Sequence, residues 1–308
     1  MASSNLPHSD FAAQNDEELD TKELLKLRQK CGRFRILVIG RANAGKTTLC
    51  QRMCNTEDPP IIHDENGNVI NILPGQERGI HDIHNEITFE ANPGFVFHDS
   101  GGFESGSSEE LEIVRAFIKA RAEGTNLSEQ LHAIWICLPV DDDRPVLPTE
   151  MEFFKGESNS VPVIAVFTKC DARDIKARRE LHNEGIVNNK DLGKLIPLQV
   201  HNYLKALEDR IKQEAVCKPK EFVFLKDMHK GFAATQAQCA ELVEKTSQSI
   251  DRKALRLLLV SVQQVNMKIC IEYAISDFVG YDKKYRLMDK IKEWFPGGGA
   301  SIKSVLYS

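Results

Sequence analysis

The residues best suited to chemistry follow a short apolar stretch, residues 34–40 (FRILVIG). The next eight residues read RANAGKTT, and together with Gly40 they fit the pattern G-x-x-x-x-G-K-S/T. In such a loop, backbone N–H groups surround phosphate oxygens, the lysine (Lys46) reaches the β- and γ-phosphates, and the hydroxyl of Thr47 binds Mg²⁺. Because an apparent strand precedes the loop and an apparent helix follows it, the sequence predicts a nucleotide phosphate site. We expect the nucleotide to contact Asn43, Ala44, Gly45, Lys46, Thr47 and Thr48.

A second motif closes another apolar stretch, residues 95–99 (FVFHD), with Asp99 and Gly102 in the spacing D-x-x-G. An aspartate at the end of a strand beside a phosphate loop can hold Mg²⁺ through water. The glycine can bring its backbone N–H close to a γ-phosphate. We therefore expect Thr47 and Asp99 to be the metal ligands, and Gly102 to contact the nucleotide.

A third motif, Thr168-Lys169-Cys170-Asp171, follows the apolar stretch 161–167. The carboxylate of Asp171 can accept hydrogen bonds from both N1–H and N2–H₂ of guanine. Adenine lacks this donor pair, and leaving a buried carboxylate unpaired is costly. The stem of Lys169 can pack over the base. The sequence therefore favours a guanine nucleotide, with Thr168, Lys169 and Asp171 at the base.

These three motifs, in this order and each after an apolar strand, resemble the translation-factor-like branch of P-loop GTPases. That branch includes septin-like, Era-like and immunity-associated GTPases. More narrowly, residues 77–83 (ERGIHDI) and 92–100 (NPGFVFHDS) are similar to GTP-binding proteins common in filamentous fungi. The resemblance covers residues 34–230 and implies a Mg²⁺-dependent GTPase domain. It also places a guanine-contacting segment after residues 221–225, so we expect a backbone contact at Lys226 and Asp227.

The sequence departs from the wider family at positions that bear on catalysis. Thr168 stands where many GTPases have Asn, a change that several branches tolerate. Phe103 follows Gly102 where Ras-like GTPases carry the Gln that orients the attacking water, so we expect slow hydrolysis. No threonine evidently senses the γ-phosphate, and the catalytic residue stays open. The candidates are Glu77, Arg78, His81 and Asn43.

Asn43 has two interpretations. It can be a turn residue that tolerates an unusual backbone conformation. Alternatively, its side-chain oxygen can help place a K⁺ ion beside the phosphates, as the resemblance to some GTPases implies.

Composition agrees with a globular protein of 308 residues with 42% hydrophobic residues. The net charge of −5 argues against a general nucleic-acid or anionic-membrane surface. The eight cysteines form no C-x-x-C pair, which favours buried, reduced thiols. The polar N-terminus lacks a signal-like apolar run, and the longest apolar stretch, residues 255–262, is too short to span a bilayer. We therefore expect no transmembrane segment and a cytoplasmic location.

The alternation of strand and helix patterns predicts an α/β fold of three layers, with a mostly parallel sheet and helices on both faces. The resemblance implies that this is the P-loop NTPase fold. A hairpin of residues 84–90 and 94–99 would add one antiparallel edge strand. Residues 55–79 are expected to be a long loop. The expected further elements are strands at 34–40, 133–138, 161–167 and 221–225, and helices at 46–54, 109–123, 149–155, 197–215 and 232–248.

The expected domains are an N-terminal arm (1–33), largely disordered, a GTPase domain (34–249) and a C-terminal helical extension (250–308). The extension carries helical patterns at 254–278 and 283–295, which either pack on the GTPase domain or face a partner or membrane.

Two other clusters have simpler interpretations. Asp141-Asp142-Asp143-Arg144 is expected to be a solvated acidic loop rather than a metal site. The spacing of His63, His81, His84 and His98 matches no recognisable zinc ligand set.

The main functional hypothesis is a slow GTPase that acts as a molecular switch. GTP would order residues 55–83 and 99–108, support self-association as a homodimer through the nucleotide face, and allow an unidentified effector protein to bind. The alternative is a non-catalytic scaffold that binds GTP or GDP in order to assemble or fold. An ATP-using, kinase-like enzyme is a third hypothesis.

Overall fold

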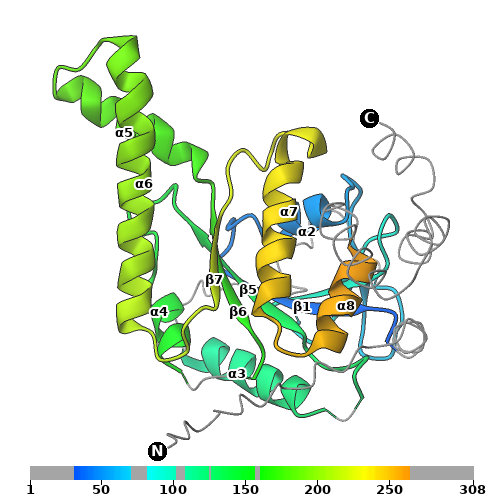
Figure 1. Cartoon of the computed structure of the whole chain (residues 1–308). Coiled ribbons are helices and arrows are strands. Elements are labelled where there is room, and N and C mark those ends of the chain that lie inside the picture. Colours follow the sequence, from blue (N-terminus) through cyan, green and yellow to red (C-terminus); the bar gives the residue numbers. More distant parts are fainter. Residues whose placement is uncertain (1–30, 71–81, 102–107, 125, 157–159, 264–308) are drawn as a thin grey trace, which may run out of the picture.

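A computed structural model describes residues 31–70, 82–101, 108–124, 126–156 and 160–263. Within these residues, seven strands form one sheet in the order β2-β3-β4-β1-β5-β6-β7 (Figure 1). The strands are β1 (Phe34–Ile39), β2 (Ile61–His63), β3 (Glu86–Thr88), β4 (Phe95–Asp99), β5 (Ala133–Pro139), β6 (Val163–Thr168) and β7 (Glu221–Phe224).

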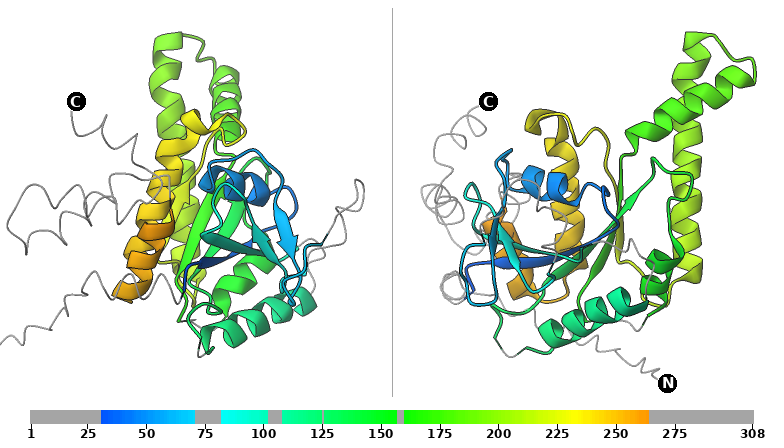
Figure 2. Two further views of the ribbon diagram at one scale, coloured as in Figure 1. Left: turned by 90° about the vertical axis from the view of Figure 1, so that its right-hand side faces the viewer. Right: turned by 180° about the vertical axis from the view of Figure 1, so that it is seen from behind.

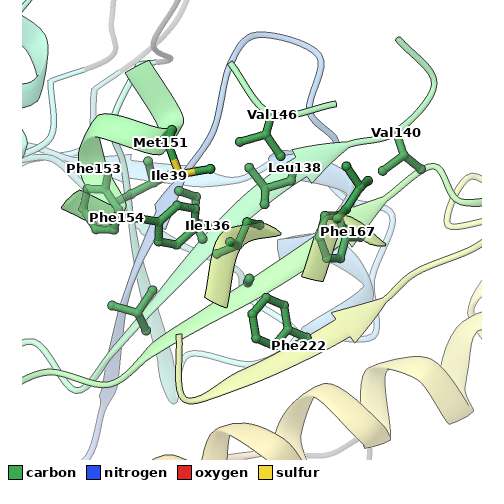
Figure 3. Close-up of a cluster of buried hydrophobic side chains, with 14 of the residues drawn as sticks. Ile39, Ile136, Leu138, Val140, Val146, Met151, Phe153, Phe154, Phe167 and Phe222 are labelled. Atoms are coloured by element: carbon green, nitrogen blue, oxygen red, sulfur yellow. The ribbon is translucent and has the colours of Figure 1, made fainter. Parts of the chain in front are cut away.

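Helices cover both faces of the sheet, which gives the three expected layers. They are α2 (Lys46–Met53), α3 (Ser108–Ala122), α4 (Pro148–Lys155), α5 (Asp171–Asn183), α6 (Asn189–Glu214), α7 (Phe232–Ser249) and α8 (Lys253–Val262). Alternate residues of β1 point to opposite faces. Leu37 and Ile39 join the core beneath α3, α4, α5 and α6, whereas Ile36 and Val38 join the core beneath α2, α7 and α8. Figure 3 shows part of the first core around Phe154 and Phe167.

The sheet confirms the predicted α/β P-loop fold. β4, β1, β5, β6 and β7 are parallel, and β3 pairs antiparallel with β4. β2 was not expected, because it lies within the predicted loop 55–79. Its three residues pair antiparallel with β3 and add a strand beyond it. A strand this short carries too little alternation to be recognised in a sequence.

The helix after Asp171 was also not predicted. α5 buries only Arg173, Ala177 and Leu181, so its apolar periodicity is weak. α6 starts earlier than expected, at Asn189, and includes Pro197. The side chain of Asn188 caps α6 by accepting a hydrogen bond from the Lys190 N–H at 3.0 Å. Together, α5 and the first half of α6 project from the body of the molecule (Figures 1 and 2).

α8 covers the first part of the helix predicted at 254–278, and it packs on the sheet beside β1. Its last turn contacts the β3–β4 turn, where the side-chain N–H of Asn92 donates to the Val262 carbonyl at 3.0 Å. The N-terminal arm up to residue 30, the remainder of the 254–278 helix and the helix predicted at 283–295 lie outside the described residues. No helix in the described ranges is both long and apolar enough to cross a membrane.

Candidate nucleotide-binding site

The phosphate loop joins β1 to α2, and it has glycine at two positions where the backbone conformation or a close neighbour disfavours a side chain. Gly40 has φ 152°, and a Cβ at this position would lie 2.6 Å from the carbonyl oxygen of Cys137 on β5. Gly45 and Asn43 adopt left-handed backbone conformations, with φ of 86° and 58°. The turn is closed by the Ala44 N–H, which donates to the Arg41 carbonyl at 3.1 Å. Only glycine fits at residue 40, because the loop runs directly against the neighbouring strand.

Lys46 folds back across this loop. Its Nζ donates to the carbonyl oxygens of Gly40 at 2.7 Å and Arg41 at 3.2 Å, and it lies 3.6 Å from Oδ1 of Asp99. The side chain is only 10% exposed. A cation is therefore held between the loop and the end of β4, in position to bind phosphate oxygens.

Thr47, Asp99 and Lys46 line one small cavity, of about 30 Å³. A hydroxyl and a carboxylate are oxygen donors of the kind that Mg²⁺ prefers, so these residues fit the expected metal. Gly102 and Phe103 lie outside the described residues, as do Glu77, Arg78 and His81.

A larger cavity of about 270 Å³ adjoins the phosphate loop and contains the third motif. Thr168 ends β6, and its hydroxyl donates to the Ala44 carbonyl at 2.8 Å. This hydrogen bond joins the base motif to the phosphate loop. The cavity is lined by Gly45, Thr48, Leu49, Asp141, Thr168, Lys169, Asp171, Ala172, Leu225, Met228 and His229.

Residues 225–229, here called the base loop, contribute Leu225, Met228 and His229 to the lining of this cavity. The Asp227 N–H donates to Oδ1 of Asp171 at 2.9 Å, and the Lys226 N–H donates to Oε1 of Gln238 at 2.5 Å. The structure thus brings the expected residues Lys226 and Asp227 to the base motif, with their N–H groups bonded to protein. Met228 and His229 line the cavity itself. Neither of these two residues belongs to a motif by which it could have been identified in the sequence.

The acidic loop after β5 is exposed, as expected, but its carboxylates have defined partners. Asp141 pairs with Lys169 at 2.7 Å, Asp142 lies 3.7 Å from Arg41, and Asp143 pairs with Lys176. The simple interpretation as a solvated loop missed this arrangement, because the partners come from three separate segments of the chain. The loop bridges the phosphate loop and the base motif.

Arg41 fastens the phosphate loop to the same segment. Its guanidinium donates to the carbonyls of Pro139, Arg144 and Pro145 at 3.0–3.2 Å. Its Nε lies 3.7 Å from Oε1 of Glu150, a fully buried carboxyl on α4. Burial raises the pKa of Glu150 to about 7, although a hydrogen bond from the Leu147 N–H and the charge of Arg41 act in the opposite direction.

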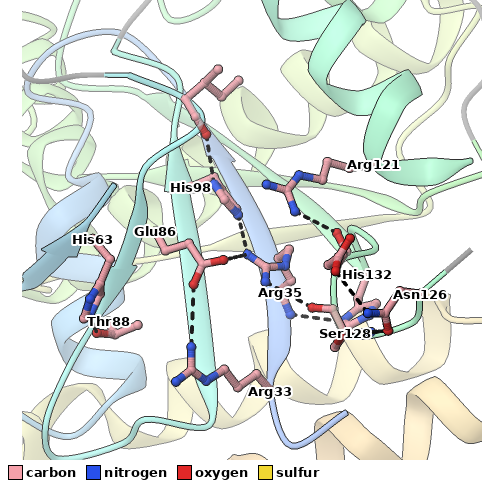
Figure 4. Close-up of polar contacts among 12 residues, drawn as sticks. Arg33, Arg35, His63, Glu86, Thr88, His98, Arg121, Asn126, Ser128 and His132 are labelled. Carbon is pink, nitrogen blue, oxygen red and sulfur yellow. Dashed lines mark hydrogen bonds and ion pairs between the residues drawn. The ribbon is translucent and has the colours of Figure 1, made fainter. Parts of the chain in front are cut away.

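A second buried network joins β1, β3 and β4 (Figure 4). Arg35 donates to Glu86 at 2.7 Å and to Nε2 of His98 at 2.8 Å, while Nδ1 of His98 donates to the Ile83 carbonyl at 2.9 Å. Desolvation, together with the charges of Arg35 and Arg121, lowers the pKa of His98 to about 3, so the imidazole is neutral. This neutral histidine connects the strand that carries Asp99 to the end of the segment expected to act as a switch.

The motif residues meet at one edge of the sheet, because β1, β4, β6 and β7 are parallel and each is followed by one part of the site. Residues 35–169 match the family model described as "50S ribosome-binding GTPase". The chain contains a P-loop GTPase domain. The matched stretch includes the phosphate loop, Asp99 and the residues Thr168 and Lys169 of the base motif. No curated protein matches the chain.

Several solved GTPase domains are similar to this chain. The septin GTPase domain from Chlamydomonas reinhardtii is 16% identical, with a TM-score of 0.30, over 51% of this chain and 62% of that chain. The G domain of the T. maritima FeoB iron transporter is 17% identical, with a TM-score of 0.33, over 70% of this chain and 98% of that chain. A GDP-bound S. thermophilus NFeoB variant is 13% identical, with a TM-score of 0.36, over 88% and 90%.

Proposed function

We propose that the protein is a Mg²⁺-dependent GTPase that hydrolyses GTP slowly and acts as a molecular switch. One observation carries the proposal: the phosphate loop, Asp99 and the base motif meet at the same edge of the sheet, around two cavities that are both lined by residues of the segment 45–50. Each group has a distinct role there. The fixed cation of Lys46 would bind the phosphates, the oxygen donors of Thr47 and Asp99 would hold the metal, and the carboxylate of Asp171 would bind the base.

Different residues of the chain would bind the phosphates, the metal and the base. Lys46 exchanges its contacts with loop carbonyls for phosphate oxygens, and the backbone N–H groups of residues 43–48 surround the same phosphates. Thr47 and Asp99 would hold Mg²⁺, which neutralises charge on the β- and γ-phosphates when it is bound. Lys169 packs along the base, while Asp171 accepts its two N–H donors.

Asn43 is a candidate residue for completing the catalytic site. Asn43 is exposed and takes a left-handed conformation in the phosphate loop. We infer that its side chain helps to place a K⁺ ion beside the phosphates, and that a second copy docks on the nucleotide face when GTP is bound. Glu77, Arg78 and His81 are the other candidates for positioning water. An effector protein, the domain boundaries and the cytoplasmic location stay predictions.

Nucleotide competition tests the assignment. Unlabelled GTP should displace a fluorescent GDP, whereas ATP at the same concentration should not. Asp171→Asn should shift the preference toward xanthine nucleotides, because the purine then offers a carbonyl to the new amide donor. Equal displacement by ATP would reject the GTPase proposal in favour of an ATP-using enzyme.

Phosphate release then separates a switch from a scaffold. A GTPase should release phosphate from GTP in the presence of Mg²⁺, and Lys46→Ala should remove this activity. Tight guanine-nucleotide binding without any phosphate release, at every protein concentration, would support the non-catalytic scaffold.

A further inference from the structure

The base loop is held by side chains from three helices. Gln238 on α7 bonds the main chain of Lys226, and Arg52 on α2 donates from Nε to the Met228 carbonyl at 3.1 Å. Nζ of Lys226 lies 2.9 Å from both carboxylate oxygens of Asp174 on α5. The main chain of residues 226 and 228 is therefore bonded to two helices, and the side chain of Lys226 to a third.

Among these contacts, the one from Gln238 is two-sided. Its Oε1 accepts from the Lys226 N–H at 2.5 Å, and its Nε2 donates to the Lys226 carbonyl at 2.9 Å. One residue earlier, the Leu225 N–H still donates to Phe167 of β6 at 2.7 Å. At the point where the chain leaves the sheet, the side-chain amide of Gln238 therefore supplies the main-chain hydrogen bonds that a neighbouring strand would otherwise supply.

The consequence reaches the base motif through the next residue. Asp227 has φ 55°, a conformation uncommon outside glycine, and its N–H donates to Oδ1 of Asp171. Because Gln238 fixes Lys226, it also fixes the direction of this N–H. We propose that Gln238 is a positioning residue for base recognition, which orients the carboxylate of Asp171 through the main chain of residues 226–227.

This inference rests on the proposed guanine binding and makes it more specific. Guanine presents two donors to the carboxylate, N1–H and N2–H₂, and both must be met in one orientation. Hypoxanthine presents only N1–H. A carboxylate that can rotate therefore loses more with guanine than with hypoxanthine, so Gln238 should affect the choice of base as well as the affinity.

The experiment compares GDP with inosine diphosphate on the full chain. Gln238→Ala should weaken GDP binding roughly tenfold, the effect of losing about one well-placed hydrogen bond, and inosine diphosphate binding by less. The ratio of the two affinities should therefore fall. Gln236→Ala is the matched control, since Gln236 lies on the same helix and is exposed. Its affinity ratio should equal that of the unmodified protein.

A second variant guards against a loss of folding. Gln238→Glu keeps an acceptor for the Lys226 N–H but cannot donate to the Lys226 carbonyl as a carboxylate, and it should lower the same ratio. In an Asp171→Asn background, Gln238→Ala should have little further effect on the ratio, because the two residues act on the same contact.

An unchanged ratio in folded Gln238→Ala and Gln238→Glu would overturn the inference, even if both affinities fall together. If the unmodified protein binds adenine nucleotides as tightly as guanine nucleotides, the proposed function itself is rejected. The two failures are therefore distinguishable.

Discussion

Thr168 uses its hydroxyl to bond the phosphate loop, at the position where many GTPases carry Asn. Thr168 thus joins the base motif to the phosphate loop through a single hydrogen bond. Lys46 likewise has protein partners for its charge, two carbonyls and the carboxylate of Asp99. At the scale of residues, contacts within the protein hold both Thr168 and Lys46 in place.

Lys46→Ala should abolish tight nucleotide binding, because the phosphate charges lose their fixed cation. Titration with a fluorescent GDP measures the effect. Thr47→Ala is the useful comparison, since it should weaken binding only when Mg²⁺ is present. Undiminished GTP affinity in Lys46→Ala would mean that the phosphates bind elsewhere.

Glu150→Gln should change how stability depends on pH. The folded pKa of Glu150 is about 7, against an ordinary value of 4.5, so folding favours the protonated form. This stabilisation is fully present below pH 4.5 and is lost as the pH rises through 7. Relative to the Gln variant, the unmodified protein should therefore lose up to about 3 kcal/mol between pH 4 and pH 8.

Urea unfolding of both proteins at several pH values checks this prediction. The comparison cancels the titration of all other groups. A constant difference in unfolding free energy across the pH range would contradict a raised pKa at Glu150.

The residues that sequence analysis identified share a feature: each belongs to a motif with fixed spacing after an apolar strand. Lys46, Asp99 and Asp171 could be found in this way. Gln238 and Arg41 could not, because their importance depends on partners far away in the sequence. The same holds for the pairing of Asp141 with Lys169.

At the scale of elements, prediction succeeded where apolar patterns were long. Buried strands such as β1 and β6, with every residue buried, were recognised from their continuous apolar runs. β2 and α5 were missed because neither shows a clear period. Pro197 also misled the prediction of α6, since proline is typical of a helix start but lies inside this helix.

The contact between α8 and the β3–β4 turn gives an element-scale prediction. A Cβ on Gly94 would lie 2.8 Å from Cβ of Val262, so Gly94→Ala must displace α8 or the turn. Overpacking of this kind costs about 1–3 kcal/mol, and the midpoint of urea unfolding should fall accordingly.

Gly193→Ala is the matched control for this change. Gly193 lies within α6, and a methyl group at this position would meet no other atom within 4 Å. Alanine should therefore raise stability by about 0.5–1 kcal/mol through its higher helix propensity. Equal effects of the two substitutions would show that α8 does not pack against Gly94 in solution.

At the scale of the whole molecule, the proposed mechanism requires a second copy and a monovalent cation. We expect GTP turnover per molecule to rise with protein concentration and to be faster in K⁺ than in Na⁺. Asn43→Ala should lose the K⁺ effect but keep nucleotide binding. A rate independent of both concentration and cation would remove this mechanism and favour an activating partner.

The central position of β1 also has a consequence for how the protein is made. Phe34 pairs with Phe95, and Ile36 pairs with Ala133, so both neighbours of this strand are synthesised long after it. Ribosomes add about 5–20 residues per second, so the apolar strand waits several seconds without a partner. During that interval the nascent chain exposes the five apolar residues of β1, together with the start of the phosphate loop. Newly made chains should therefore depend on chaperones until β5 has left the ribosome.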